Sequence, residues 1–185
     1  MACKIDIGAL FDCSALEQPG IKDYFYLVNK EDFDNNQVLT IDGTSKELTA
    51  LTLASTTQGY KFTVSKGATN IIPNVALRAA TSQDGFDHSL DVRIFDISQL
   101  SVDNIEKLRF NKVVAFVPLA NGKHLLFGRN VGLRISEFEY NPADADTAGT
   151  LRVVLKTPDE DPPEIHVPLL VADTYDITEL DSAAA

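Results

Sequence analysis

The sequence predicts a mainly β protein: a β-sandwich or barrel of two packed antiparallel sheets, with one short flanking α-helix and extended arms. Three observations support this fold class. Apolar and polar residues alternate with a period of two over most of the chain, which is typical of half-buried strands. The turn dipeptides Asp42-Gly43 and Asn121-Gly122 each separate two such runs. Only one segment repeats its apolar residues with a helical period.

The chain has 185 residues and is 44% hydrophobic, so we expect one domain with a single core. We place an N-terminal arm at residues 1–21, the β-rich domain at 22–170 and an acidic C-terminal tail at 171–185. Residues 65–85 are rich in Ser, Thr, Asn and Gly, with scattered apolar residues. Loops of this length in compact domains are usually functional or disordered, so this segment is predicted to be a long loop or arm.

The first predicted strand, residues 24–29, is apolar at both parities. A strand with this pattern is buried on both faces, against its own core and against something else. The next two runs, 37–41 and 48–53, flank the Asp42-Gly43 turn and predict a hairpin. Residues 60–64 alternate as a half-exposed strand. A long strand follows from Phe86 to about Ile97, with its apolar residues on one face.

The single predicted helix spans about residues 101–110. Ser101 is a favourable N-cap residue, because its hydroxyl can accept a hydrogen bond from a backbone N–H of the first turn. Val102, Ile105 and Leu108 share one face of the helix. Two to three turns are too few for an independently stable helix, so we expect it to pack on a sheet.

The run from Lys112 to Tyr140 predicts a β-meander. A two-residue turn at Asn121-Gly122 would place Pro118 where a strand must donate an N–H, which proline lacks. We therefore predict a four-residue loop, Ala120 to Lys123. Further on, the apolar residues change parity near Ser136-Glu137, which predicts a β-bulge at this point. The following strand, 150–156, should direct Leu151, Val153 and Leu155 inward.

Charge excludes several function classes. The net charge is −11, and residues 141–185 contain ten acidic and two basic residues. A chain this acidic lacks the Lys and Arg that phosphate binding requires, so nucleic-acid binding is not expected. No run approaches the ~20 apolar residues of a membrane helix, and the N-terminal apolar run is too short for secretion. Cys3 and Cys13 are expected to be reduced thiols of a cytoplasmic protein.

The motifs predict no catalytic, cofactor or metal site. Gly128–Gly132 lacks the residues of a phosphate-binding or dinucleotide-binding loop, and turns around a strand are the simpler interpretation. The segment 144–155 fails two ligand positions of a calcium loop. His88, His124 and His166 fall on three separate predicted strands, where hydrogen-bonded surface or core roles are the usual ones. We therefore expect that the protein is not an enzyme.

Several short segments carry a family resemblance. Cys3 to Cys13 with Pro19-Gly20-Ile21, the strand 24–29, Asn121–Gly128 and Gly132-Leu133 resemble structural proteins of tailed bacteriophages. Within that group, the order of strands and one helix is similar to tail tube proteins. The resemblance implies subunits that form hexameric rings, which stack into a tube through which DNA passes without specific binding. It also implies a location in the virion after assembly in the host bacterial cytoplasm, and partners such as a tape-measure protein.

From this resemblance we expect two sets of site residues. Joining a neighbour's sheet would cover the second face of the doubly apolar strand, and the segment 65–85 could reach the same neighbour. The predicted subunit contacts are Tyr24, Phe25, Tyr26, Leu27, Ile71 and Ile72. Glu137 and Glu139 share one strand face and are predicted to line the lumen, which should be acidic so that DNA slides through it.

Three alternatives remain open from the sequence. Another structural protein of the same viruses, such as a head-tail connector, baseplate or capsid-decorating protein, would show the same motifs. A carbohydrate-binding or adhesion module would need Tyr24, Tyr26 and Tyr60 exposed on one face. A small hydrolase would need a histidine next to Asp or Ser.

Overall fold

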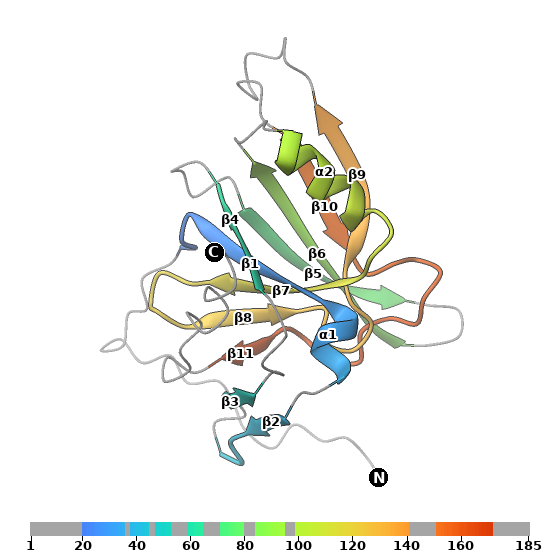
Figure 1. Ribbon diagram of the computed structural model, residues 1–185. Helices are drawn as coiled ribbons and strands as arrows, with labels where there is room; N and C mark the ends of the chain where they lie inside the picture. Colours follow the sequence, from blue (N-terminus) through green and yellow to red (C-terminus); the bar gives the residue numbers. More distant parts are fainter. Residues whose placement is uncertain are drawn as a thin grey trace.

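Two β-sheets form the body of the protein, as predicted (Figure 1). The computed structural model describes residues 20–35, 38–44, 47–52, 59–64, 71–79, 84–94, 99–140 and 151–171. The seven-stranded sheet has the order β2 (Val38–Ile41), β3 (Leu48–Thr52), β11 (Leu169–Val171), β8 (His124–Phe127), β7 (Val113–Pro118), β1 (Tyr24–Asn29) and β4 (Gly59–Thr63). The four-stranded sheet has the order β5 (Ile71–Ala79), β6 (Asp84–Ile94), β10 (Leu151–Lys156) and β9 (Arg134–Tyr140).

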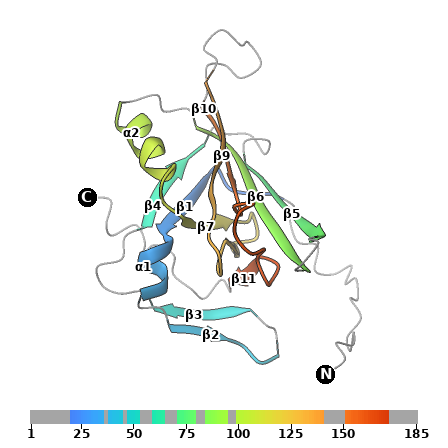
Figure 2. The ribbon, with the colours of Figure 1, turned by 90° about the vertical axis from the view of Figure 1, so that its right-hand side faces the viewer.

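The pairings between these strands are antiparallel except for the contact of β11 with β3, which is parallel. Two helices flank the sheets, α1 (Lys30–Asn35) and α2 (Gln99–Leu108). Figure 2 shows both helices on the same side of the molecule, away from β5. The fold is therefore the predicted sandwich, with one helix more than expected.

The main core lies between the two sheets. It buries alternate residues of each inward-facing strand, and its larger members are Phe25, Leu27, Leu90, Phe127, Leu133, Leu151 and Leu155. The predicted inward positions of β6 and β10 are confirmed, since Leu90, Val92, Leu151 and Val153 are at most 2% exposed. Short bridges from Val64 to Ile94 and from Val113 to Leu133 join the sheets at their margins.

A second apolar cluster lies on the other face of the seven-stranded sheet. Its buried members are Tyr26, Val28, Phe33, Leu48, Val114, Phe116, Leu126 and Val171. Phe33 reaches this cluster from α1 and packs edge-on against Phe116, with ring centroids 6.5 Å apart. The prediction that the first strand is buried on both faces is confirmed, and the second covering comes at least in part from this chain's own helix α1.

The segment 65–85 corrects one prediction. Residues 71–79 form β5, a nine-residue strand that pairs along its whole length with β6, so the central part of the predicted arm is a sheet edge. The sequence IIPNVALRA did not predict a strand, because the residues of a half-exposed edge strand need not alternate strictly between apolar and polar. The arm at 1–21 lies outside the described residues except Gly20 and Ile21, and Ile21 already bridges to Leu119. Of the predicted tail, only Val171 is described, and it ends β11.

Two smaller predictions also change. The helix α2 begins at Gln99, so Ser101 lies inside the helix and is not its N-cap. The β7–β8 loop has three residues rather than four, because the Leu119 N–H donates to the Lys123 carbonyl at 2.7 Å. Gly122 adopts a φ of 90°, which suits the last position of a three-residue hairpin loop. The bulge is confirmed: the register between β9 and β10 shifts at Ser136.

Candidate assembly surface

The outward face of the four-stranded sheet is mainly polar, with Ile72, Ala76 and Val154 as its apolar members. Strand registers place on this face the residues that alternate with the core positions. Its basic residues are Arg78, Arg93, Arg134, Arg152 and Lys156, and its acidic residues are Asp87, Asp91, Glu137 and Glu139. The two signs nearly balance, so this face is charged without being acidic.

Arg152 lies at the centre of this face. Its guanidinium donates to both carboxylate oxygens of Asp91, at 2.7 to 3.2 Å, and to Glu137 at 3.4 Å. Glu139 lies 3.8 Å from the same group. The hydrogen bonds and charge of Asp91 raise the pKa of Arg152 above its usual value. Glu137 and Glu139 therefore share one strand face, as the sequence indicated, but they partner a cation there.

Both margins of this sheet are open within the described part of the chain. β5 pairs only with β6, and β9 pairs only with β10. The two edge strands are long, at nine and seven residues, and unpaired N–H and C=O groups along such an edge invite pairing with another strand.

Both edge strands also expose apolar side chains on the core-facing side. On β5 these are Val75, 37% exposed, and Leu77, 70% exposed; on β9 they are Phe138, 49% exposed, and Tyr140, 44% exposed. They extend beyond the part of the sheet that the core covers.

The predicted subunit contacts do not form one surface. Phe25, Tyr26 and Leu27 are at most 2% exposed, and their side chains pack inside the chain, so they offer nothing to a neighbour. The prediction is wrong for these three, because the chain covers both faces of β1 itself. Tyr24 is half-buried in the second cluster.

The two isoleucines of the same prediction behave differently from each other. Ile71 is 4% exposed and belongs to the core, whereas Ile72 is 53% exposed on the polar face. Both lie on the open-edged strand β5. Of the two, only Ile72 is accessible to a neighbouring molecule.

A buried carboxylate joins the two sheets at one end of the sandwich. Glu164 is 1% exposed and accepts backbone N–H groups of three consecutive residues: Asn130 at 3.0 Å, Val131 at 2.8 Å and Gly132 at 3.3 Å. Gly132 has a φ of 89°, which curls the loop around the carboxylate. This arrangement is an anion-binding nest filled by the chain's own side chain. Sequence reasoning missed it, because Glu164 is 32 residues away from Gly132.

His88 lies beside this nest and is also buried. Its Nδ1 accepts the Gly128 N–H at 3.2 Å and its Nε2 faces the His166 carbonyl at 2.9 Å, which fixes the neutral tautomer with the proton on Nε2. Burial lowers the pKa of His88, against the opposing effect of Glu164. His166 itself lies in a loop, not on a strand as predicted.

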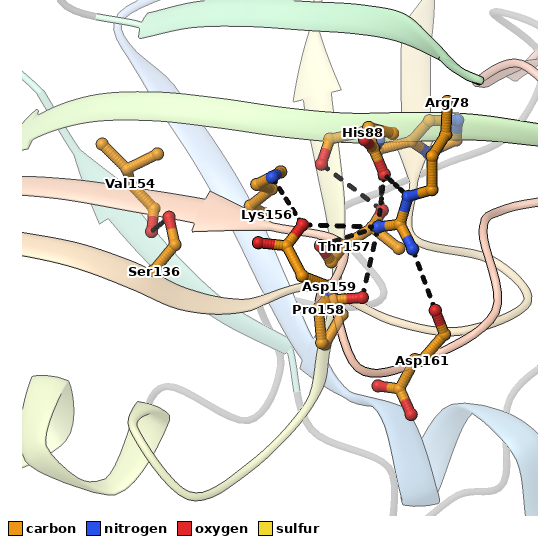
Figure 3. A network of polar contacts seen from close by, with 10 residues as sticks. Arg78, His88, Ser136, Val154, Lys156, Thr157, Pro158, Asp159 and Asp161 are labelled. Carbon is orange, nitrogen blue, oxygen red and sulfur yellow. Dashed lines mark hydrogen bonds and ion pairs between the residues drawn. The ribbon is translucent and has the colours of Figure 1, made fainter. Parts of the chain in front are cut away.

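Arg78 fastens the same end of the four-stranded sheet (Figure 3). Its Nε donates to Asp87 at 2.5 Å, and its terminal nitrogens donate to the carbonyls of Asp161 at 2.9 Å and Pro158 at 3.2 Å. The turn after β10 is thereby tied to β5. The polar groups of this network form hydrogen bonds and ion pairs with one another and with backbone carbonyls.

His124 is the one buried side chain among the described residues whose polar atoms have no hydrogen-bond partner. It is 6% exposed, and burial together with the charge of Lys22 lowers its pKa. In the described part of the chain no histidine ring bonds to a carboxylate or hydroxyl side chain, which is the pairing that the hydrolase alternative needs. The described residues also hold no group of three His, Cys, Asp or Glu side chains that could bind a metal.

The tyrosines do not form a carbohydrate-binding platform. Tyr26 is 2% exposed and Tyr24 is half-buried beside it, with ring centroids 5.6 Å apart. Tyr60, 47% exposed, lies on the opposite face of the sheet, where it lines a cavity of about 260 Å³ under α2 together with Phe62. The structure thus opposes the adhesion alternative in the form in which the sequence suggested it.

The chain was compared with known protein families, proteins and structures. No protein-family description, no curated protein and no solved structure matches the chain. Among the described helices, none is both long enough and apolar enough to span a membrane.

Proposed function

We propose that this protein is a virion structural protein, a tail tube subunit that polymerises into stacked rings around a DNA conduit. The observation that carries the proposal is the four-stranded sheet, which has one face in the core, one polar face and two long open edges. Three successive antiparallel pairings separate β5 from β9, so these edge strands run in opposite directions. When the β9 edge of one copy meets the β5 edge of the next, the antiparallel alternation continues without a break.

Closure of a ring would pair the two long open edges of this sheet. Long open edges favour uncontrolled pairing, and a closed barrel removes all edges. Because the two joined edges differ, the contact is head-to-tail, and such contacts form rings when the rotation closes. The resemblance to tail tube proteins implies six subunits in the ring, with stacking and contacts to a tape-measure protein and other tail proteins.

The polar face would then line the conduit. Of its five basic side chains, Arg78, Arg134, Arg152 and Lys156 are paired with carboxylates at 2.5 to 3.8 Å, so passing phosphates meet few unneutralised cations. This differs from the expectation of a predominantly acidic lumen. Glu137 and Glu139 would serve by neutralising Arg152, and DNA would pass without being held. The proposed location is the phage tail, after assembly in the bacterial cytoplasm.

The test is whether purified protein forms rings or tubes. We expect electron microscopy to show rings or tubes about the width of a phage tail, and light scattering to show oligomers at micromolar concentration. Both measurements should be repeated with other tail proteins present, since these can nucleate assembly. Monomers throughout would contradict the proposal. Single closed rings that never stack, even with tail proteins present, would favour the alternative of a connector or baseplate component.

A further inference from the structure

We propose that neighbouring subunits join through one defined strand register, in which Phe138 of β9 lies opposite Leu77 of the next copy's β5. In the same register Tyr140 lies opposite Val75. The partner is a second copy of this chain, and in this respect the inference rests on the proposed function. It goes further by naming the residues of the joint, which we call the β5–β9 seam.

The exposed apolar residues of both edges lie on one face of the sheet. Phe138 and Tyr140 pair with Val153 and Leu151, which point into the core. Val75 and Leu77 pair with His88 and Phe86, which lie on the same core-facing side of β6. Pairing of the two edges therefore brings these four side chains together, on the side away from the polar face. Cross-strand pairs of aromatic and aliphatic residues are the favourable unit of sheet pairing.

A single strand register forms both apolar pairs at once. In antiparallel pairing, placing Phe138 opposite Leu77 automatically places Tyr140 opposite Val75. Shifting by two residues in either direction keeps the facing but forms only one pair among these four side chains, either Tyr140 with Leu77 or Phe138 with Val75. Shifting by one residue would place Phe138 and Tyr140 opposite residues of β5 that face the other side of the sheet.

The charges on the polar face are compatible with the same register. The same register places Glu137 opposite Arg78, and Glu139 opposite Ala76, so no like charges meet. The Glu137 side chain is 63% exposed and has room to approach. Arg78 already holds Asp87, so Glu137 would extend an existing ion pair across the seam.

This register also fixes how far the strands tilt from the axis of the ring. Within one copy, Phe138 lies level with Val153, Val92 and Ile71. Opposite Leu77 of the next copy, it is displaced six residues along β5 from that level. A displacement of about 20 Å over four strands spaced about 4.8 Å apart corresponds to strands tilted by about 45° from the ring axis. Closed barrels have tilts of roughly 35–45°, so the register is compatible with closure.

The direct test is disulfide cross-linking across the seam. In a chain with Cys3 and Cys13 replaced by Ser, the double variant Leu77→Cys with Phe138→Cys is assembled and oxidised with diamide. Residues directly opposite in antiparallel strands have Cβ atoms close enough for a disulfide. We expect a ladder of covalent oligomers on non-reducing gels. Each single variant, and the control pair Leu77→Cys with Phe110→Cys, should give no ladder; Phe110 is 69% exposed but lies on neither edge.

A second variant, Leu77→Asp, tests the seam without oxidation. Leu77 is 70% exposed, so the subunit should fold with an unchanged circular dichroism spectrum while assembly is lost. Rings by electron microscopy without cross-links in the seam pair, or normal rings from Leu77→Asp, would overturn the seam and leave the proposed function standing. Monomers in the parent protein under all conditions would overturn both.

Discussion

The two sheets of this protein use similar strands in different ways. The seven-stranded sheet buries apolar residues on both faces, and its edge strands β2 and β4 have only four and five residues. The four-stranded sheet buries one face, covers the other with charged residues, and ends in edge strands of nine and seven residues. Short edges are a common protection against unwanted pairing, and the second sheet lacks it.

This difference separates stability from assembly. Residues that are buried on both faces of a sheet contribute to the free energy of unfolding through burial and packing. Half-exposed apolar residues along an open edge contribute little to the fold, and in the proposed ring a neighbouring copy would bury them. The first sheet should therefore respond to substitutions by unfolding, and the second by failing to assemble.

The largest contrast is expected between two phenylalanines. Phe116 is fully buried in the seven-stranded sheet, so Phe116→Ala should lower the free energy of unfolding by about 3–5 kcal/mol. Phe138→Ala, at a half-exposed edge position, should cost less than about 1 kcal/mol. Denaturant unfolding at low protein concentration measures both. Equal costs would show that the edge of the four-stranded sheet belongs to the folded core.

The nest around Glu164 should show the next largest effect, because it ties the sheets together. Glu164→Ala leaves the three backbone N–H groups of the nest without their acceptor, that of Gly132 in a buried position, and should destabilise the protein by about 2–3 kcal/mol. The matched control is Glu160→Ala, since that side chain is 67% exposed. Thermal unfolding of the two variants compares them. A loss no greater than that of the control would mean that the nest contributes nothing to the joint.

A smaller effect is expected from pH. Burial lowers the pKa of His88 and of His124 in the folded protein, while in the unfolded chain both titrate near the usual value of about 6.5. Below that pH the unfolded chain binds protons that the folded protein does not, so stability falls as pH falls. Between pH 7 and 5 we expect a loss of about 1 kcal/mol or more.

His124→Leu should reduce this pH slope and stabilise the protein near neutral pH, because it removes two buried nitrogens without partners. The neighbouring change Leu125→Met is the control and should leave the slope as it is. Urea unfolding at several pH values measures both variants. An unchanged slope in His124→Leu would remove His124 as its cause.

The smallest effect is expected at Arg152. Its ion pairs with Asp91 and Glu137 lie on the polar face, with the Arg152 side chain 32% exposed. Arg152→Gln should change the free energy of unfolding by less than about 1 kcal/mol, and less again in high salt. A loss of several kcal/mol, insensitive to salt, would show that this face is part of the folded structure rather than an assembled surface.

Local sequence signals predicted several elements correctly. The parity change at Ser136 located the bulge in β9, because one extra residue reverses the facing of every side chain after it. The Asp42-Gly43 turn predicted the hairpin of β2 and β3, and Thr44 indeed donates its N–H to the Asp42 side chain at 2.8 Å. In each case the signal and the structure lie within a few residues of each other.

Other features escaped prediction because their causes are not local. The helix α1 has six residues and a single buried apolar side chain, Phe33, so it shows no periodicity. Strand β5 carries Pro73 and apolar residues on both faces, a pattern that only its position at an edge explains. The role of Glu164 depends on a loop far away in the sequence.

The sequence by itself determined most of the segments of this protein that become strands, the approximate positions of several turns, and which residues of those strands share a face. These properties follow from backbone preferences and a period of two, which act between near neighbours. Only the tertiary structure decided which strands pair, that the chain covers both faces of β1, and that β5 and β9 are the open edges. Pairing partners are far apart in sequence, and an edge is defined by the absence of a neighbour among the described strands, which no local pattern records.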